Sequence, residues 1–283
     1  MKAIYSHWNT EIGSNGYNNF HDFATMMALS VLNSRKHFQE VNLVTNSLYA
    51  KILIDELELP FDNVSTSHDR FDDLPKWQWG YAKLAASAEQ TSPFVHIDND
   101  VVLWKGIESS VKSRVAFFQS LEAPFKGFYN YYNPLLKFAE TLPNLPKVIK
   151  DNSVPWAYNC GITGINDLSI IQDWFKLSTS FIRDKDNIQL IEANKDLLPH
   201  QNLLHEQYFI ASLCQSRKLK VNRDIGFILD YNNLHEDAIP KGYTHLWGGA
   251  KNSKEVMIRV KEKLLKESPQ YGKFIIDKLN NLF

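Results

Sequence analysis

Two carboxylates one residue apart stand directly after a short apolar run in the first half of the sequence. Phe94-Val95-His96-Ile97 has the composition of a buried strand, and Asp98-Asn99-Asp100 follows it. Two carboxylates at this spacing can both reach one hard divalent cation, which prefers oxygen ligands and commonly shares them with substrate phosphates. A turn after a strand also favours Asp and Asn, so the tripeptide alone is equally consistent with a turn that binds nothing.

A second motif whose residues could bind a metal or an anion is His245-Leu246-Trp247-Gly248-Gly249-Ala250-Lys251, which overlaps the end of a strand candidate. Imidazole combined with carboxylates suits Mn²⁺ better than Ca²⁺. Gly248 and Gly249 allow backbone N–H groups to approach an anion, and Lys251 adds a flexible positive charge. The alternative is a glycine-rich loop with a core histidine.

A lysine precedes the carboxylates on a predicted helix. The segment Trp77–Leu84 continues to about Glu89, and its apolar residues recur at helical spacing. Lys83 lies on this helix, where its side chain could point to the same rim as Asp98. A solvated surface lysine is the alternative for this position.

Strand and helix signals alternate in the segments that must position these groups. The strand candidates are Ala3–Ser6, Val41–Val44 and Phe94–Ile97, and the helix candidates between them are Phe20–Leu32, Leu48–Leu57 and Pro75–Glu89. This order predicts an α/β fold with a largely parallel sheet flanked by helices. Ligands of such sheets bind beyond the carboxyl ends of the strands, where Asp98 and Asp100 stand.

The rest of the chain is less regular and ends in helices. Strand candidates cover residues 115–119, 161–165 and 243–246, and helix candidates cover 167–177, 203–219 and 253–266. Ser268-Pro269 starts a last helix, because proline at the first helical position loses no needed hydrogen bond. We therefore predict an α/β domain over residues 1–251 and a helical C-terminal appendage over residues 252–283.

The composition argues against several classes of protein. The 283 residues are 44% hydrophobic and 22% charged, which are ordinary values for a globular protein. The net charge of −1 lacks the basic excess of a typical nucleic-acid binder. Cys160 and Cys214 are too few for a disulfide framework or a cysteine-rich zinc site. The sequence suggests neither a signal peptide nor a transmembrane segment, so we expect a cytoplasmic protein.

The order of these motifs resembles that of the GT-A glycosyltransferases in the glycogenin and lipopolysaccharide galactosyltransferase group (family 8). In that group a Lys or Arg precedes Asp-x-Asp, and Asn-x-Gly, Asp-Gln and His-x-x-Gly-x-x-Lys follow. The matching segments here are Lys83-Leu84, Phe94–Leu103, Asn159-Cys160-Gly161, Glu206-Gln207 and His245-x-x-Gly248-x-x-Lys251. The start, Ile4-Tyr5-Ser6-His7-Trp8, is more similar to the related family 32 and the large clostridial toxins, whose first strand ends in an aromatic residue that stacks on uracil.

The resemblance implies a GT-A domain over residues 1–251, with a Rossmann-like, mixed, mostly parallel sheet flanked by helices. It also implies a metal-dependent glycosyltransferase that moves a sugar from a nucleotide-diphosphate donor, a UDP-sugar, with retention of anomeric configuration. It implies Mn²⁺ (or Mg²⁺) held by Asp98, Asp100 and His245. The implied donor-binding residues are Tyr5, His7 and Trp8 at the uracil, Asp98 at the ribose, and Lys83, Gly248 and Lys251 at the diphosphate or sugar. The implied catalytic residues, which line the sugar pocket, are Asn159, Glu206 and Gln207.

The sequence departs from the family pattern at two places. The family usually has Asp where Glu206 stands, and often has Pro-Trp after the lysine, where this chain has Asn252-Ser253. Trp8 can equally be a tryptophan of the core or its rim. The chemistry is nevertheless coherent without the family, because a nucleoside diphosphate leaves with a double negative charge that a divalent cation and lysines stabilise.

The acceptor is open among a glycan, a lipid-linked sugar, a peptide and a protein. We expect residues 122–157, a long aromatic-rich stretch, to help form an acceptor cleft, since aromatic rings offer flat apolar faces. Ordinary packing of a long connection is the alternative. Two other functions also fit parts of the sequence. A haloacid-dehalogenase-like phosphatase has an apolar strand followed by Asp-x-Asp, and a non-catalytic module could bind a glycan or a partner through residues 125–132.

Overall fold

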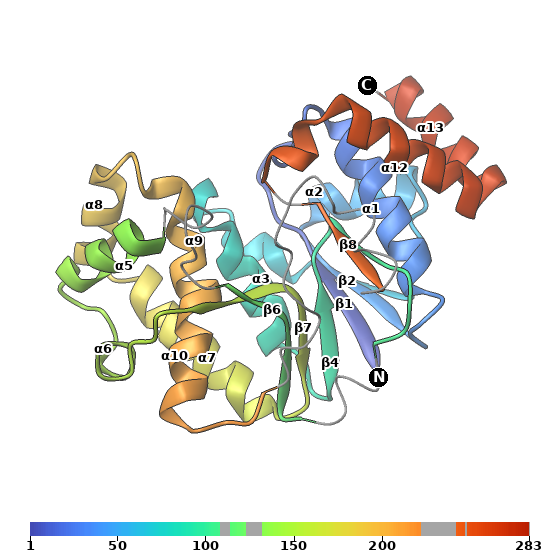
Figure 1. The fold of residues 1–283 in the computed structure, drawn as a ribbon. Coiled ribbons are helices and arrows are strands. Elements are labelled where there is room, and N and C mark those ends of the chain that lie inside the picture. The colour runs from blue at the N-terminus through green and yellow to red at the C-terminus, as the bar shows by residue number, and fades with distance from the viewer. Residues whose placement is uncertain (108–113, 123–131, 222–241, 247, 283) are drawn as a thin grey trace. The chain divides into compact units, whose positions relative to one another are not determined.

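The computed structural model describes residues 1–107, 114–122, 132–221, 242–246 and 248–282 (Figure 1). The strands are β1 (Lys2–Ser6), β2 (Val41–Val44), β3 (Asn63–Ser65), β4 (Phe94–Ile97), β5 (Val101–Leu103), β6 (Ala116–Glu122), β7 (Ala157–Ile165) and β8 (Tyr243–His245). The α-helices are α1 (Phe20–Ser34), α2 (Ser47–Ala50), α3 (Trp79–Ala88), α5 (Tyr132–Thr141), α6 (Lys147–Asp151), α7 (Leu168–Ile182), α8 (Lys185–Ala193), α9 (Gln201–Leu203), α10 (Phe209–Ser216), α12 (Lys254–Glu267) and α13 (Pro269–Leu282). The remaining helical turns are the 3₁₀ segments η2 (Ser67–Phe71), η3 (Lys76–Gln78), η4 (Leu198–His200) and η7 (Gly248–Asn252), and the π-helices η1 (Lys51–Glu56) and η5 (Leu204–Tyr208).

The main sheet has six strands in the order β3-β2-β1-β4-β7-β6, and β5 pairs with β8 in a separate two-stranded sheet. The strands β1, β2 and β3 are parallel, with Ala3 opposite Val41 and Asn42 opposite Asn63. β6 runs antiparallel to β7. The main sheet is therefore mixed, and helices flank it. The predicted α/β fold is confirmed.

The chain divides into two compact units. Unit 1 comprises residues 1–72, 96–108 and 228–283, and unit 2 comprises residues 73–95 and 109–227. The division falls within β4, so the segment that follows this strand belongs to unit 1.

Unit 1 is built around the first parallel strands and helix α1. Ala3, Ile4 and Tyr5 of β1 are fully buried, as expected for a parallel strand covered on both faces. Asn19 caps α1, because its side chain accepts a hydrogen bond from the backbone N–H of Asp22. These elements place the carboxyl end of β1 beside the start of α1.

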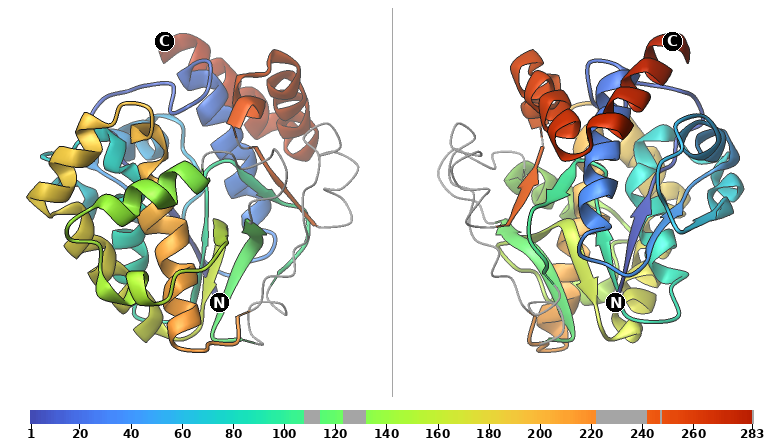
Figure 2. Two further views of the ribbon diagram at one scale, coloured as in Figure 1. Left: turned by 60° about the vertical axis from the view of Figure 1, so that its left-hand side comes forward. Right: turned by 90° about the vertical axis from the view of Figure 1, so that its right-hand side faces the viewer.

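The two C-terminal helices pack against α1, and Figures 1 and 2 show them beside it. Ser253 caps α12, whose range agrees with the predicted helix over residues 253–266, and Pro269 begins α13, as the sequence predicts. Gly272 lets the two helices come close, because a Cβ at this position would lie 3.2 Å from the backbone oxygen of Leu264. The predicted domain boundary between residues 251 and 252 stays a prediction.

Unit 2 contains β6, β7 and the helices packed on them. Every residue of β7 is buried, α3 packs on α7, and α10 packs on both α7 and β7. Asp167 caps α7 by accepting from the N–H of Ser169. Residues 123–131, which include most of the aromatic stretch predicted to contact the acceptor, lie outside the described residues.

Two predicted helices contain a π-helical turn that the spacing of apolar residues did not reveal. The helix expected over residues 48–57 is α2 followed by η1, and the one over 203–219 is α9, η5 and α10 in succession. A π-turn shifts the helical phase locally, and such turns often occur at functional sites. Within the described residues, no helix combines the length and apolar character needed to cross a membrane.

Candidate metal centre and its surroundings

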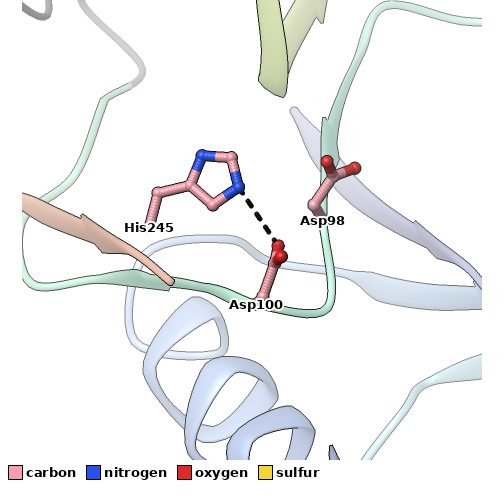
Figure 3. A group of neighbouring side chains, drawn as sticks. All are labelled: Asp98, Asp100 and His245. Atoms are coloured by element: carbon pink, nitrogen blue, oxygen red, sulfur yellow. Dashed lines mark ion pairs between the residues drawn. The ribbon is translucent and has the colours of Figure 1, made fainter. Parts of the chain in front are cut away.

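Three potential metal ligands meet in unit 1, where β4 gives way to β5. The N–H of Val101 donates to the carbonyl of Asp98 at 3.0 Å, which closes a tight turn and places both carboxylates at the strand end. β8 pairs antiparallel with β5, so that His245 lies opposite Val101. One ligand atom from each of Asp98, Asp100 and His245 lies within 4.8 Å of the other two. Figure 3 shows the side chains converging, with Asp100 between the other two.

Asp100 is the most buried carboxylate of this cluster and contacts a lysine and a histidine. Its Oδ1 lies 3.3 Å from Nε2 of His245, and its Oδ2 forms an ion pair with Nζ of Lys251. Burial alone would raise the pKa of Asp100, but the nearby Lys251 and His245 outweigh burial and hold the pKa well below its usual range. Asp100 is therefore ionised at neutral pH.

The chemistry of the donor set fits a divalent cation. Nδ1 of His245 is buried and makes no hydrogen bond with any described residue, and Oδ1 of Asp100 is buried with Nε2 of His245 at 3.3 Å as its polar contact. The side chain of Asp98 keeps 25% of its surface exposed, which leaves an approach to the cluster. Two carboxylates and one imidazole suit Mn²⁺ better than Ca²⁺, so Asp98, Asp100 and His245 would hold such an ion.

Polar contacts connect Asp98 and Asn99 to the end of β1. Nε2 of His96 lies 3.0 Å from the hydroxyl of Ser6, and Nδ1 of the same ring lies 3.5 Å from Oδ1 of Asp98. The side-chain amide of Asn99 donates to the backbone oxygen of Ser6 at 3.3 Å and to Nδ1 of His7 at 3.2 Å. The turn that presents the carboxylates is therefore held by hydrogen bonds as well as by the sheet.

Two of the residues that the sequence assigned to the uracil, Tyr5 and Trp8, have buried side chains. The hydroxyl of Tyr5 bonds to Ser30 and Ser34 at 2.7 Å, so its side chain faces α1, and the role of Tyr5 at the uracil stays a prediction. Trp8 is buried, and its indole N–H makes no hydrogen bond with the described residues.

His7 is enclosed by aromatic rings. Its ring centroid lies 4.8 Å from that of Phe23 and 4.1 Å from that of Tyr49. Burial, with a smaller contribution from the charge of His68, lowers the pKa of His7 to about 3. His7 is therefore neutral at physiological pH and contributes no positive charge to anion binding.

Lys251 is held by the loop that precedes α1. Its ammonium lies 5.5 Å from the ring centroid of Tyr17, and the side chain of Asn18 donates to the carbonyl of Asn252 at 3.1 Å. Gly248 begins η7 with φ of 55°, a left-handed conformation that glycine adopts without strain. A Cβ at Gly249 would meet nothing within 4 Å, so this segment has room to change conformation.

Tyr17 belongs to the surroundings of the cluster but was missed in the sequence. It is buried, and its hydroxyl makes no hydrogen bond with any described residue. Burial, reinforced by the charges of Asp100, Asp22 and Asp98, raises its pKa well above the usual value. The available signal was its place, directly after the glycine-containing loop that follows the first strand.

A second cluster of predicted residues lies within unit 2. Nζ of Lys83 donates to Oε1 of Glu206 at 2.5 Å and to the carbonyl of Cys160 at 2.8 Å. Both charged side chains are almost completely buried, so the solvated-lysine interpretation of Lys83 is wrong. Glu206 and Gln207 lie in the π-helix η5, where the carbonyl of His205 accepts hydrogen bonds from Trp174 and Ser178.

Asn159 stands on β7 beside a carboxylate that the sequence did not single out. Its side-chain amide donates to Oε1 of Glu122 at 2.6 Å, and its Oδ1 accepts from the N–H of Gly161 at 2.9 Å. Glu122 is buried at the end of β6. The only sequence signal for Glu122 was an acidic residue shortly after the apolar start of a strand.

The predicted site residues thus fall into two groups, one in each unit. Unit 1 contains Tyr5, His7, Trp8, Asp98, Asp100, His245, Gly248 and Lys251, and unit 2 contains Lys83, Asn159, Glu206 and Gln207. Asp100 directly contacts His245 and Lys251, and Glu206 directly contacts Lys83.

The fold and the first cluster define an α/β protein with a candidate divalent-metal site. The chain belongs to DUF6734, a family of unknown function whose family model matches residues 1–278. No curated protein matches the sequence.

Solved structures resemble the chain at low similarity. The galactosyltransferase LgtC, in complex with donor and acceptor sugar analogs, has 12% identity and a TM-score of 0.46 over 93% of this chain and 95% of that chain. Mouse xyloside xylosyltransferase 1 in its apo form has 12% identity and a TM-score of 0.42 over 87% of this chain and 97% of that one. The apo structure of the bifunctional glycosyltransferase WbbM has 12% identity and a TM-score of 0.49 over 98% of this chain and 51% of its own. At this similarity the activities of those proteins do not transfer to this chain.

Proposed function

We propose that the protein is a metal-dependent glycosyltransferase that moves a sugar from a UDP-sugar to an acceptor, with retention of anomeric configuration. The observation that carries the proposal is the convergence of Asp98, Asp100 and His245 with Lys251 beside them. The order of motifs along the chain, which resembles that of GT-A glycosyltransferases, supports the same function.

The cluster has the charges that this reaction requires. Departure of a nucleoside diphosphate leaves a double negative charge, and a bound divalent cation would stabilise it as a Lewis acid. Asp98, Asp100 and His245 would hold that cation, and the ammonium of Lys251 would turn from Asp100 toward the diphosphate. The room beside Gly249 would allow η7 to make this movement.

The sugar-binding roles that the resemblance implies stay predictions for four residues: the buried pair Lys83 and Glu206, and Gln207 and Asn159. Glu206 or Gln207 would support positive charge at the anomeric carbon during attack from the same face as the departing group. The acceptor is a hydroxyl-bearing glycan, lipid-linked sugar, peptide or protein, and the contribution of residues 122–157 to its binding also stays a prediction.

The surroundings of the carboxylates favour this function over a phosphatase. A haloacid-dehalogenase-like phosphatase would need a further acidic pair near Asp98 and Asp100. The potential metal-binding group that the described residues form there is completed by His245, and Lys251 lies beside it.

Calorimetric titration of UDP with and without Mn²⁺ tests the proposal. We expect measurable UDP binding that depends on Mn²⁺, and we expect Asp100→Asn to lower the affinity at least 100-fold, because the cation loses its most buried charged ligand. Asp151→Asn is the matched control, since Asp151 is an exposed aspartate of α6 in unit 2. Equal binding of UDP by the unaltered protein with and without Mn²⁺ would overturn the proposal, and a thermal-shift screen of UDP-sugars with Mn²⁺ would identify the donor.

A further inference from the structure

A chain of polar contacts leads from the end of β1 to the first carboxylate of the metal cluster. The hydroxyl of Ser6 lies 3.0 Å from Nε2 of His96, and Nδ1 of His96 lies 3.5 Å from Oδ1 of Asp98. All three residues belong to unit 1. His96 is only 1% exposed, so its ring cannot swing into solvent and keeps one edge toward each neighbour.

The backbone explains why the ring lies beside the carboxylate. Side chains two residues apart along an extended strand point to the same side of the sheet, and His96 precedes Asp98 by two positions at the end of β4. The turn after β4 then fixes Asp98, because its carbonyl accepts from Val101. The ring of His96 is thereby directed at one oxygen of the carboxylate.

The two contacts together select one tautomer of the histidine. A neutral imidazole carries its proton on one nitrogen only, and the other nitrogen accepts a hydrogen bond. The 3.5 Å between Nδ1 of His96 and Oδ1 of Asp98 is a close polar contact that exceeds the usual length of an N–H···O hydrogen bond. An ionised carboxylate only accepts hydrogen bonds, so this contact is favourable when the proton is on Nδ1, facing Asp98. Nε2 then accepts a hydrogen bond, and Ser6 supplies the hydroxyl that donates it.

We propose that His96, oriented by Ser6, is a positioning residue that sets the direction of the Asp98 carboxylate for cation binding. The inference rests on the metal site of the proposed function and assigns two further residues to it. His96 and Ser6 do not contact the cation. They act through Asp98, in the way that hydrogen-bonding partners behind metal ligands commonly restrict ligand orientation.

Serine hydrolases contain the same order of groups: a hydroxyl, an imidazole and a carboxylate. The two arrangements differ in which of these groups the contacts orient. In a hydrolase the carboxylate is buried behind the histidine and orients it for the serine. Here the carboxylate is partly exposed, and one of its oxygens belongs to the metal cluster. The group that the contacts orient is therefore Asp98, with Ser6 at the supporting end.

The test is the affinity of the full chain for Mn²⁺ in the presence of UDP, measured by calorimetry on three variants. His96→Leu removes both ring nitrogens at similar volume and should weaken Mn²⁺ binding by about tenfold or more. His96→Asn keeps a polar donor near the position of Nδ1 and should recover most of this loss. Ser6→Ala should weaken binding by about threefold, because it acts only through the histidine.

His68→Leu is the matched control, because His68 is another fully buried histidine of unit 1 and lies in η2. Its melting temperature shows the effect of removing a buried ring, and its Mn²⁺ affinity should match that of the unaltered protein. Recovery in His96→Asn separates positioning from packing, since a role in packing alone would favour leucine.

Each outcome decides the proposal. Folded His96→Leu with unchanged Mn²⁺ affinity, or His96→Asn no better than His96→Leu, overturns it while the proposed function stands. If His96→Leu does not fold, the decision passes to Ser6→Ala, for which unchanged affinity is the overturning result. A protein that binds no Mn²⁺ with UDP, even before alteration, overturns the proposed function as well.

Discussion

Two buried carboxylates of this protein are each paired with a lysine, but the two pairs differ in their freedom. In unit 2, Lys83 and Glu206 are 6% and 2% exposed, and Lys83 also donates to the carbonyl of Cys160. In unit 1, the side chain of Asp100 is 9% exposed, and its partner Lys251 is 23% exposed and lies in a short 3₁₀ turn that begins with two glycines.

The difference indicates that one pair is fixed and the other is exchangeable. A fully desolvated pair cannot separate without leaving an uncompensated charge in the interior. Lys251 can leave Asp100 for solvent or an anion, provided that another cation replaces it. An exchangeable pair at the candidate metal site would let an incoming cation take the place of Lys251 beside Asp100.

The largest expected effect comes from breaking the fixed pair. Lys83→Met should reduce the free energy of unfolding by about 3–5 kcal/mol, because Glu206 is left buried without its counter-charge. Urea unfolding monitored by circular dichroism measures this change. The double variant Lys83→Met with Glu206→Gln should be less destabilised than Lys83→Met alone, since no buried charge remains. A single variant within about 1 kcal/mol of the unaltered protein would show that the pair is not fixed.

Removing the lysine of the exchangeable pair should strengthen binding of Mn²⁺, whereas removing the lysine of the fixed pair should destabilise the fold. Lys251→Met should tighten Mn²⁺ binding in the absence of nucleotide by roughly tenfold, because the cation no longer competes with a charge-assisted contact to Asp100. The same variant should weaken binding of UDP in the presence of Mn²⁺, since the diphosphate loses its lysine. Lys254→Met, three residues further on at the exposed start of α12, is the matched control. Equal or weaker Mn²⁺ binding in Lys251→Met would contradict the comparison.

The smallest expected effect on stability comes from a surface carboxylate that contacts two lysines. Glu267 contacts Lys263 and Lys36, whose side chains are 37% and 47% exposed. Hydrogen bonds from Lys263 and then Lys36 lower the pKa of Glu267 to about 2. Because the folded pKa is lower than the unfolded one, the contribution of Glu267 to stability is present above about pH 4.5 and is lost as the pH falls toward 2.

Glu267→Gln should therefore reduce the free energy of unfolding by about 1 kcal/mol or less at about pH 6, and by a smaller amount at about pH 3. Urea unfolding at the two pH values checks the sign. A loss that grows on acidification would mean that the pairing does not stabilise the folded state.

The sequence was sufficient to predict the metal cluster but not its contacts. An apolar strand before Asp98 and a second strand before Gly248 place both segments at strand ends, where side chains of an α/β fold meet. The ion pair of Lys251 with Asp100 could not be predicted, because it depends on the conformation of η7 and not on the residue types. The aromatic residue Tyr17 was missed for a related reason, since its place beside Lys251 depends on the path of a loop.

In unit 2 the prediction of Lys83 left two interpretations open, because a single lysine on an amphipathic helix has no periodic signal of its own. Burial next to Glu206 depends on η5, whose π-turn changes which side chains face inward. Glu122 was not identified, since a carboxylate at a strand end resembles an ordinary boundary residue. Its contact with Asn159 requires the antiparallel pairing of β6 and β7, which the spacing of strands did not indicate.

The pairing of β5 with β8 has a consequence for which residue can bind metal at all. β8 has only three residues, and a slip of one position along β5 would turn His245 to the opposite face. Trp104 opposes this slip, because its indole N–H donates to the hydroxyl of Thr244 at 2.9 Å and its backbone N–H donates to the carbonyl of Gly242 at 2.7 Å. The register set by a tryptophan outside the cluster therefore determines that the imidazole of His245, and not the side chain of Thr244 or Leu246, completes the candidate metal centre.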